Sequence, residues 1–154
     1  MHERIIVPLD GSKLGEAALP YIEQLVSKLS PEVRTEITLI QVLSRLTHPL
    51  VAGEAVLRVP YNEQEIEQAK KTATDYLDEA GESLRSKGAT VMVRVAIGDT
   101  SEEIGKVAEK INADLVAMST HGRSGLSRWA FGSVTDKVLR RGGGVPILMV
   151  KATE

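Results

Sequence analysis

The chain of 154 residues contains no cysteine, which excludes disulfide bridges and thiolate chemistry. Aromatic residues make up only 3% of it, which argues against the stacking platforms that bind single-stranded nucleic acid. The formal net charge of −2 gives no support for a nucleic-acid surface. No apolar run approaches the length of a membrane span, and no signal peptide is evident. We therefore expect a cytoplasmic protein without nucleic-acid or membrane partners.

The sequence does contain a regular alternation of strand-like and helix-like segments. Apolar, β-branched runs typical of buried parallel strands cover residues 4–9, 35–42, 90–96, 114–118 and 146–150. Apolar residues at helical spacing cover residues 13–29, 63–87, 100–111 and 134–141. This order predicts one doubly wound, Rossmann-like α/β domain over residues 1–154. Its five-stranded parallel sheet is expected to carry helices on both faces.

Proline and capping residues indicate the boundaries of these segments. Pro20 lies inside the first helical pattern and predicts a kink or a local break, and Ser12 is the expected N-cap. Thr100, with Glu103 three residues later, predicts a capping box. Residues 43–62 are the least regular part of the chain. They are expected to form a long loop, a mobile flap or a partner-binding segment.

The most distinctive stretch is residues 119–133, which follows the apolar run 114–118 and precedes a helical pattern. A strand that opens into a Gly-, Ser- and Arg-rich loop before a helix can bind an anion, because free N–H groups face the loop. Gly122 and Gly132 would allow close backbone approach, and Ser133 is placed as the helix N-cap. An ordinary strand-to-helix connection has the same composition, so both interpretations stay open. The loop matches neither the Walker A motif nor the GxGxxG fingerprint.

The ends of two predicted strands are expected to bring a carboxylate close to this loop. In doubly wound sheets, ligands bind beyond the carboxyl ends of the strands, where the strand order reverses. The first strand ends near Asp10 and the fourth near Ser119. If these strands are neighbours, Asp10 faces the loop across one crevice. Such a pair suits a ribose and a phosphate chain.

With this layout, the chain resembles the universal stress protein family over essentially its full length. The resemblance is carried by residues 5–12, 119–134 and 146–150. The nucleotide-binding members carry a pattern Gly-x2-Gly-x9-Gly-(Ser/Thr). Gly122, followed after nine residues by Gly132 and Ser133, matches its last two thirds. The first glycine is replaced by Ser119, whose backbone N–H is retained, so nucleotide binding is expected to survive.

The resemblance implies an adenine nucleotide α-hydrolase-like fold that binds ATP, with Mg²⁺ arriving on the triphosphate. The positions implied to contact the nucleotide are Pro8, Asp10, Val42, Met118, Ser119, Gly122, Gly132, Ser133 and Val134. Those up to Ser119 would border the adenine and ribose, Gly122 would approach the ribose and phosphates, and the last three would bind phosphates. Strand-end packing, a turn and a helix cap are the structural alternatives for these positions.

The resemblance also implies a homodimeric stress-response regulator, paired through the edge strand 146–150. One alternative is an interaction module of the same fold that does not use nucleotide. Another is a slow ATPase or a self-phosphorylating protein, although no general base is evident and no catalytic residue is predicted. His121 could orient a water molecule, but a structural role fits it better. His48 is given no chemical role.

Overall fold

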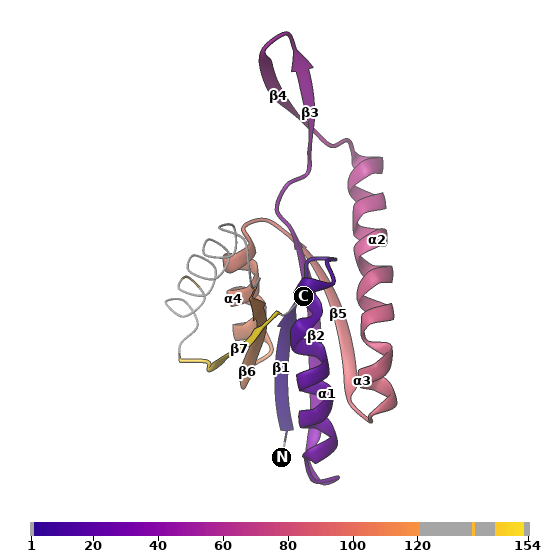
Figure 1. Cartoon of the computed structure of the whole chain (residues 1–154), viewed down its shortest axis with the longest axis vertical. Helices are drawn as coiled ribbons and strands as arrows, with labels where there is room; N and C mark the ends of the chain where they lie inside the picture. Colours follow the sequence, from indigo (N-terminus) through magenta and orange to yellow (C-terminus); the bar gives the residue numbers. More distant parts are fainter. Residues whose placement is uncertain (1, 121–136, 138–143, 153–154) are drawn as a thin grey trace.

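The computed structural model describes residues 2–120, 137 and 144–152. Its elements are β1 (His2–Pro8), the 3-10 turn η1 (Leu14–Ala17), α1 (Ala18–Lys28), β2 (Arg34–Leu43), β3 (Thr47–Ala52), β4 (Ala55–Pro60), α2 (Glu63–Ala80), α3 (Glu82–Ser86), β5 (Thr90–Ile97), α4 (Thr100–Lys110), β6 (Leu115–Thr120) and β7 (Ile147–Lys151). Five parallel strands form one sheet in the order β5-β2-β1-β6-β7 (Figure 1). This confirms the predicted sheet. The strand order reverses between β1 and β6, which are hydrogen-bonded neighbours, and β7 is at an edge.

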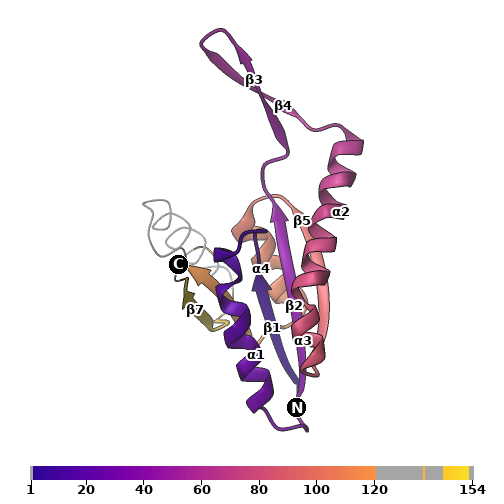
Figure 2. The ribbon, with the colours of Figure 1, turned by 45° about the vertical axis from the view of Figure 1, so that its right-hand side comes forward.

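The alternation of side chains along each strand divides the core between the two faces of the sheet. Ile5 and Val7 of β1 pack with residues of α1, α2 and α3 on one face. Ile6, between them, packs with Ile104 of α4 on the opposite face. Figure 2 shows the strands enclosed between these helices. Burial on both faces explains why the strands of this sheet are continuous apolar runs.

The first helix is broken where Pro20 predicts a break. The 3-10 turn η1 ends at Ala17, and α1 begins at Ala18. Pro20 therefore lies in the first turn of α1, where its missing N–H breaks no intrahelical hydrogen bond. The N-cap of η1 is Lys13 rather than the predicted Ser12, although Ser12 Oγ accepts a hydrogen bond from the Gly15 N–H at 3.0 Å.

The prediction that residues 43–62 are irregular is wrong. Within them, β3 and β4 form an antiparallel hairpin that projects from the body of the protein (Figures 1 and 2). Gly53 supplies the turn with a φ of +66°. Pro49 and Pro60 suggest a loop when they are judged alone. Both strands of this isolated hairpin are edge strands, which tolerate proline.

Two helix boundaries also differ from the predictions. The helix expected over residues 63–87 is divided at Gly81, where an added Cβ would lie 2.9 Å from Val91 Cγ1 of β5. This close approach to the sheet accounts for the glycine. The N-cap of α4 is Asp99 rather than Thr100, because Asp99 Oδ1 accepts a hydrogen bond from the Glu102 N–H at 3.0 Å. The predicted helix over residues 134–141 falls on residues that are not described, apart from Lys137.

Candidate functional site

The predicted site residues that the structure describes come from the carboxyl ends of three adjacent strands. These residues are Pro8, Asp10, Val42, Met118 and Ser119. Pro8 ends β1, Val42 is next to the last residue of β2, and Asp10 lies in the turn that follows β1. The remaining predicted residues, Gly122, Gly132, Ser133 and Val134, lie outside the described residues, as do His121 and the rest of the predicted loop. The sheet topology therefore brings these five described residues to one edge of the sheet.

Three of these side chains lie on the same face of the sheet. Pro8, Val42 and Met118 are all half-buried. Each stands two residues beyond a fully buried member of the core on the α4 face, namely Ile6, Ile40 and Val116. Because side chains alternate along a strand, all three project toward that face. They form an apolar border at the carboxyl edge, suited to one face of a flat ring.

The Asp10 carboxylate shapes the turn between β1 and η1. Its Oδ1 accepts hydrogen bonds from the Ser12 N–H at 2.9 Å and from the Ser12 Oγ at 2.6 Å. A Cβ at Gly15 would lie 2.4 Å from the same Oδ1, so a larger residue there would have to displace the carboxylate. Gly11 has a φ of +86°, which lets the chain reverse direction next to the carboxylate. Asp10 is exposed, and its position is determined by the turn around it.

The Ser119 hydroxyl connects β6 to the start of the first helix. It accepts a hydrogen bond from the Ala18 N–H at 2.9 Å and donates one to the Gly15 carbonyl at 2.8 Å. The Gly15 N–H in turn donates to Ser12 Oγ, and Ser12 donates to Asp10. A continuous chain of hydrogen bonds thus joins the ends of β1 and β6. A glycine at position 119 would lack this hydroxyl, which gives a structural reason for the serine.

No protein metal site is evident in the residues that the structure describes. Residues 2–120, 137 and 144–152 hold no group of three or more His, Asp or Glu side chains that could bind a metal ion. In the same part of the chain, none of the helices has the length and hydropathy needed to cross a membrane.

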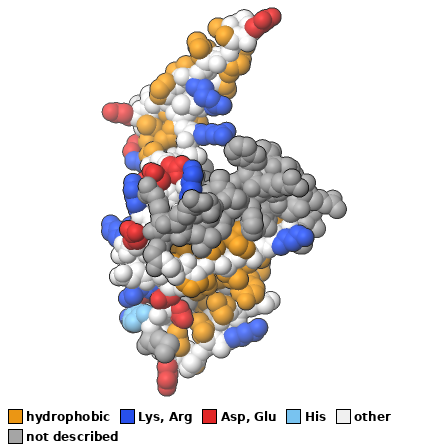
Figure 3. Space-filling model, turned by 90° about the vertical axis from the view of Figure 1, so that its left-hand side faces the viewer, with side chains coloured by type: hydrophobic (Ala, Val, Ile, Leu, Met, Phe, Trp, Pro, Cys, Tyr) orange, Lys and Arg blue, Asp and Glu red, His pale blue; other side chains and the backbone are white. Residues whose placement is uncertain are grey.

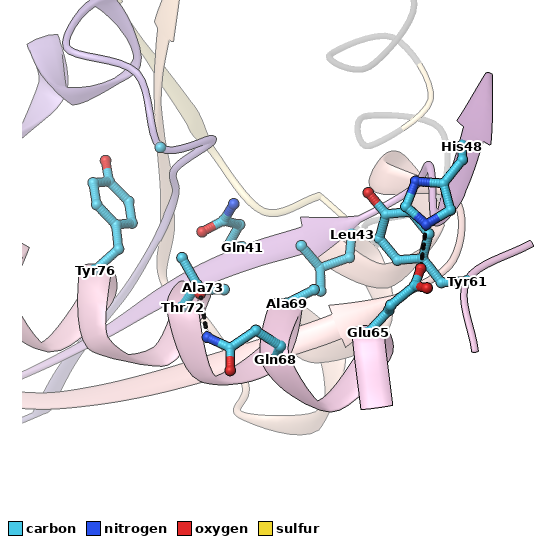
Figure 4. A pocket seen from close by; sticks show the side chains of 11 residues that line it. Gln41, Leu43, His48, Tyr61, Glu65, Gln68, Ala69, Thr72, Ala73 and Tyr76 are labelled. Carbon is cyan, nitrogen blue, oxygen red and sulfur yellow. Dashed lines mark hydrogen bonds and ion pairs between the residues drawn. The ribbon is translucent and has the colours of Figure 1, made fainter. Parts of the chain in front are cut away.

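Sequence reasoning missed a second feature, a cavity between β2, the hairpin base and α2 (Figure 4). His48, for which the sequence predicts no chemical role, hydrogen-bonds the Glu65 carboxylate through Nε2. The centroid of its ring lies 4.5 Å from the centroid of the Tyr61 ring. These contacts join β3 to α2 across the cavity mouth. Nothing in the local sequence signals them, because they depend on how the base of the hairpin lies beside the first turn of α2.

Together, these observations define the chain as a doubly wound α/β protein whose strand order reverses between β1 and β6, the place where such folds bind ligands. The polar turn at Asp10 and the apolar border meet there. The family model described as the universal stress protein family matches residues 1–151, and the chain belongs to this family.

Individual relatives agree with this assignment. The chain is 29% identical to universal stress protein MJ0577 of Methanocaldococcus jannaschii, over 98% of this chain and 96% of the relative. The solved structure of that protein superposes with a TM-score of 0.72 at 24% identity, covering 100% and 99% of the two chains. A universal stress protein in complex with cAMP has a TM-score of 0.60 at 20% identity, covering 98% of each chain. An Arabidopsis thaliana family member with AMP bound has a TM-score of 0.63 at 13% identity, covering 98% and 92%.

Proposed function

We propose that this chain is a regulatory protein that binds an adenine nucleotide, ATP with Mg²⁺, at the crevice between β1 and β6. The observation that carries the proposal is the hydrogen-bonded link between Asp10 and Ser119, beside the half-buried apolar border on the same edge. The cAMP and AMP complexes of similar proteins support an adenine nucleotide as the ligand. A chain without cysteine suits the reducing cytoplasm, where ATP is abundant.

Each part of the nucleotide has a proposed partner. The adenine ring packs against Pro8, Val42 and Met118, and the Asp10 carboxylate accepts hydrogen bonds from the ribose hydroxyls. Ser119 contributes its backbone, because its hydroxyl is engaged by Gly15 and Ala18. The phosphates are assigned to residues that complete the family pattern outside the described part: Gly122, Gly132, Ser133 and Val134. Mg²⁺ would arrive with the triphosphate and would offset its negative charge there.

Calorimetric titration of nucleotide-stripped protein tests the proposal. ATP with Mg²⁺ should bind saturably at one site per chain, and Gly132→Val should abolish binding by blocking the backbone approach. Asp10→Asn keeps an oxygen for the turn but removes the charge, so it should weaken binding while preserving the fold. At about 100 times its dissociation constant, the ligand should stabilise the wild type by about 2.7 kcal/mol. An absence of heat and of thermal shift with ATP, AMP and cAMP alike would overturn the proposal.

We further propose that β7 pairs with β7 of a second copy to form a homodimer. β7 pairs with β6 on one side, and no described strand covers its other edge. Its residues Ile147–Val150 are half-buried, and an uncovered apolar edge strand promotes association. Sedimentation equilibrium should give twice the mass of the 16.7 kDa chain. A monomer at high micromolar concentration would contradict this pairing.

A nucleotide-independent interaction module is the second candidate, and the hairpin is the observation in its favour. All of β3 and β4 beyond Thr47 is exposed, including Val51 at 70% and Leu57 at 55%. Figure 3 shows hydrophobic side chains gathered on the hairpin, where it projects beyond the rest of the molecule. The titration above separates the two candidates, because saturable nucleotide binding rejects a module that ignores nucleotide.

A further inference from the structure

The hairpin formed by β3 and β4 exposes apolar side chains on both of its faces. Leu50 and Leu57 lie directly opposite each other on one face, and Val51 and Val56 do so on the other face. All four are exposed, Val51 at 70% and Val56 at 63%. An antiparallel sheet normally carries polar side chains on a face that meets water, and an isolated two-stranded hairpin is only marginally stable. Both features favour the addition of further strands to this hairpin.

The base of the hairpin is held beside α2, and the rest of the hairpin is accessible. His48 hydrogen-bonds Glu65 of α2, and the Tyr61 N–H donates to the Leu46 carbonyl at 2.9 Å. Beyond this base, the hairpin stands clear of the rest of the described chain (Figures 1 and 2). All residues of β4 are exposed, and no described strand pairs with its outer edge. A strand of another molecule can therefore approach β4 from the side.

The two outer edges of the hairpin differ in their backbone hydrogen-bonding groups. Ala52 and Ala55 form the last pair before the two-residue turn, and in a hairpin of this kind that pair is hydrogen-bonded. Because hydrogen-bonded and non-hydrogen-bonded pairs alternate, the backbone groups of Pro49 in β3 and of Val56 and Arg58 in β4 point outward. Proline has no N–H and interrupts the β3 edge, whereas Val56 and Arg58 offer both a donor and an acceptor. The edge of β4 is thus the better one for pairing.

The charges of the hairpin are placed symmetrically about Val56. Glu54 and Arg58 are the Asp, Glu, Lys or Arg residues of the segment 47–60, and in the described part of the chain neither forms an ion pair. If β4 pairs antiparallel with a second β4 about Val56, each Glu54 lies directly opposite the partner's Arg58, on the same face. A pairing about Arg58 would instead bring two guanidinium groups together. Opposite charges directly across two strands stabilise their pairing and like charges oppose it, so the charge pattern selects the register about Val56.

We propose that β4 pairs antiparallel with β4 of a second copy of this chain, about a twofold axis at Val56. The two hairpins then form one four-stranded sheet in the order β3-β4-β4-β3, with the tips overlapping and the bodies of the two molecules at opposite ends. The contact is isologous, so both ion pairs form together. One short strand buries less than the about 1,200 Å² of a stable interface, so we expect association at high micromolar concentration. The contact requires neither nucleotide nor the proposed β7 pairing.

The absence of cysteine from the chain allows a direct test with single-cysteine variants. In the proposed sheet the Cα atoms of residue 56 in the two copies lie about 5.5 Å apart, which a disulfide can span. Under mild oxidation at high micromolar concentration, Val56→Cys should give an interchain disulfide, seen as a dimer on a non-reducing gel. Val51→Cys is the matched control, because Val51 is similarly exposed on the same face of the hairpin. Its two copies would lie three strand spacings apart, about 14 Å, so it should cross-link at least about tenfold more slowly.

Three outcomes of the cross-linking would overturn the proposal. Equal rates for the two variants would show random collision of exposed hairpins, and faster cross-linking of Val51→Cys would show pairing through β3. No disulfide from folded Val56→Cys is the result expected of a hairpin that binds a different protein or a lipid surface. Circular dichroism checks the fold of both variants, which should be intact because the substituted side chains are exposed. The mass of dilute protein reports the proposed β7 pairing instead, so failure of one pairing is distinguishable from failure of the other.

Exchange of the two charges tests the register itself. In the Val56→Cys background, Glu54→Lys or Arg58→Glu alone sets like charges opposite each other, so each should slow cross-linking at least about fivefold. Glu54→Lys combined with Arg58→Glu restores two opposite pairs and should restore the rate. A mixture of the two single variants should also cross-link, because each offers the charge that the other lacks. If the combined variant and the mixture stay as slow as the single variants, Glu54 does not face the partner's Arg58 and the proposed pairing is wrong.

Discussion

Replacing Ser119 by alanine removes the hydroxyl that joins β6 to the first helix. The hydroxyl makes two hydrogen bonds, at 2.9 Å from the Ala18 N–H and at 2.8 Å to the Gly15 carbonyl. Both backbone groups are part-buried and lose their side-chain partner in the variant. At about 1 kcal/mol for each lost bond, Ser119→Ala should lower the free energy of unfolding by about 2 kcal/mol. For a chain of this size the melting temperature should fall by about 4–8 °C.

Ser119→Gly introduces the residue that the family pattern has at this position. It should cost about 0.5–1 kcal/mol more than alanine, because glycine in a strand loses more backbone entropy on folding. Ser27→Ala is a suitable control, since Ser27 Oγ bonds only to carbonyls of its own helix, those of Glu23 and Gln24. That exposed change should alter stability by less than about 0.5 kcal/mol.

Urea denaturation followed by far-ultraviolet circular dichroism measures all three variants, without nucleotide. The reasoning is refuted if Ser119→Ala unfolds at the same urea concentration as the wild type. It is also refuted if Ser119→Gly proves more stable than the wild type. A fall in ATP affinity of Ser119→Ala at unchanged stability would instead show that the hydroxyl serves the ligand.

Three further changes test other parts of the structure. Gly81→Ala should destabilise the protein by about 1–3 kcal/mol, because its Cβ would lie 2.9 Å from Val91 Cγ1, and an unchanged urea midpoint would contradict that packing. Asp99→Ala should lower the melting temperature at neutral pH. Hydrogen bonds, first of all from the Ser101 hydroxyl, hold the pKa of Asp99 below its ordinary value, so its contribution is present above the ordinary carboxyl pKa. That contribution is lost as the pH falls through the lowered pKa, so melts of the wild type and Asp99→Ala should converge in acid, and a constant difference would exclude this cap. Leu57→Ser should leave unfolding within about 0.5 kcal/mol of the wild type, because the side chain is exposed, and a larger loss would mean that the hairpin packs on something in solution.

The sequence by itself determined the parallel sheet, and it indicated the edge of that sheet at which the proposed site lies. Continuous apolar runs occur in strands buried on both faces, and helical spacing between them requires crossovers, so the parallel sheet follows from pattern alone. Pro20 determined the break in the first helix for a local reason, the missing N–H. The family pattern added the expectation of a nucleotide. Asp10 is predicted to face the loop that begins at Ser119 if the first and fourth predicted strands are neighbours, and the pairing of β1 with β6 confirms that they are.

Only the tertiary structure decided what several residues do, because their partners are distant in sequence. Ser119 bonds to Gly15 and Ala18, more than 100 positions away, and no local pattern encodes such contacts. Glycine stands at position 81, between α2 and α3, because Val91 of β5 lies against it. The cavity between β2, the hairpin base and α2 forms only when these elements lie side by side, which makes it invisible in the sequence. Local pattern dictates which elements form, whereas packing between elements dictates which polar groups find partners.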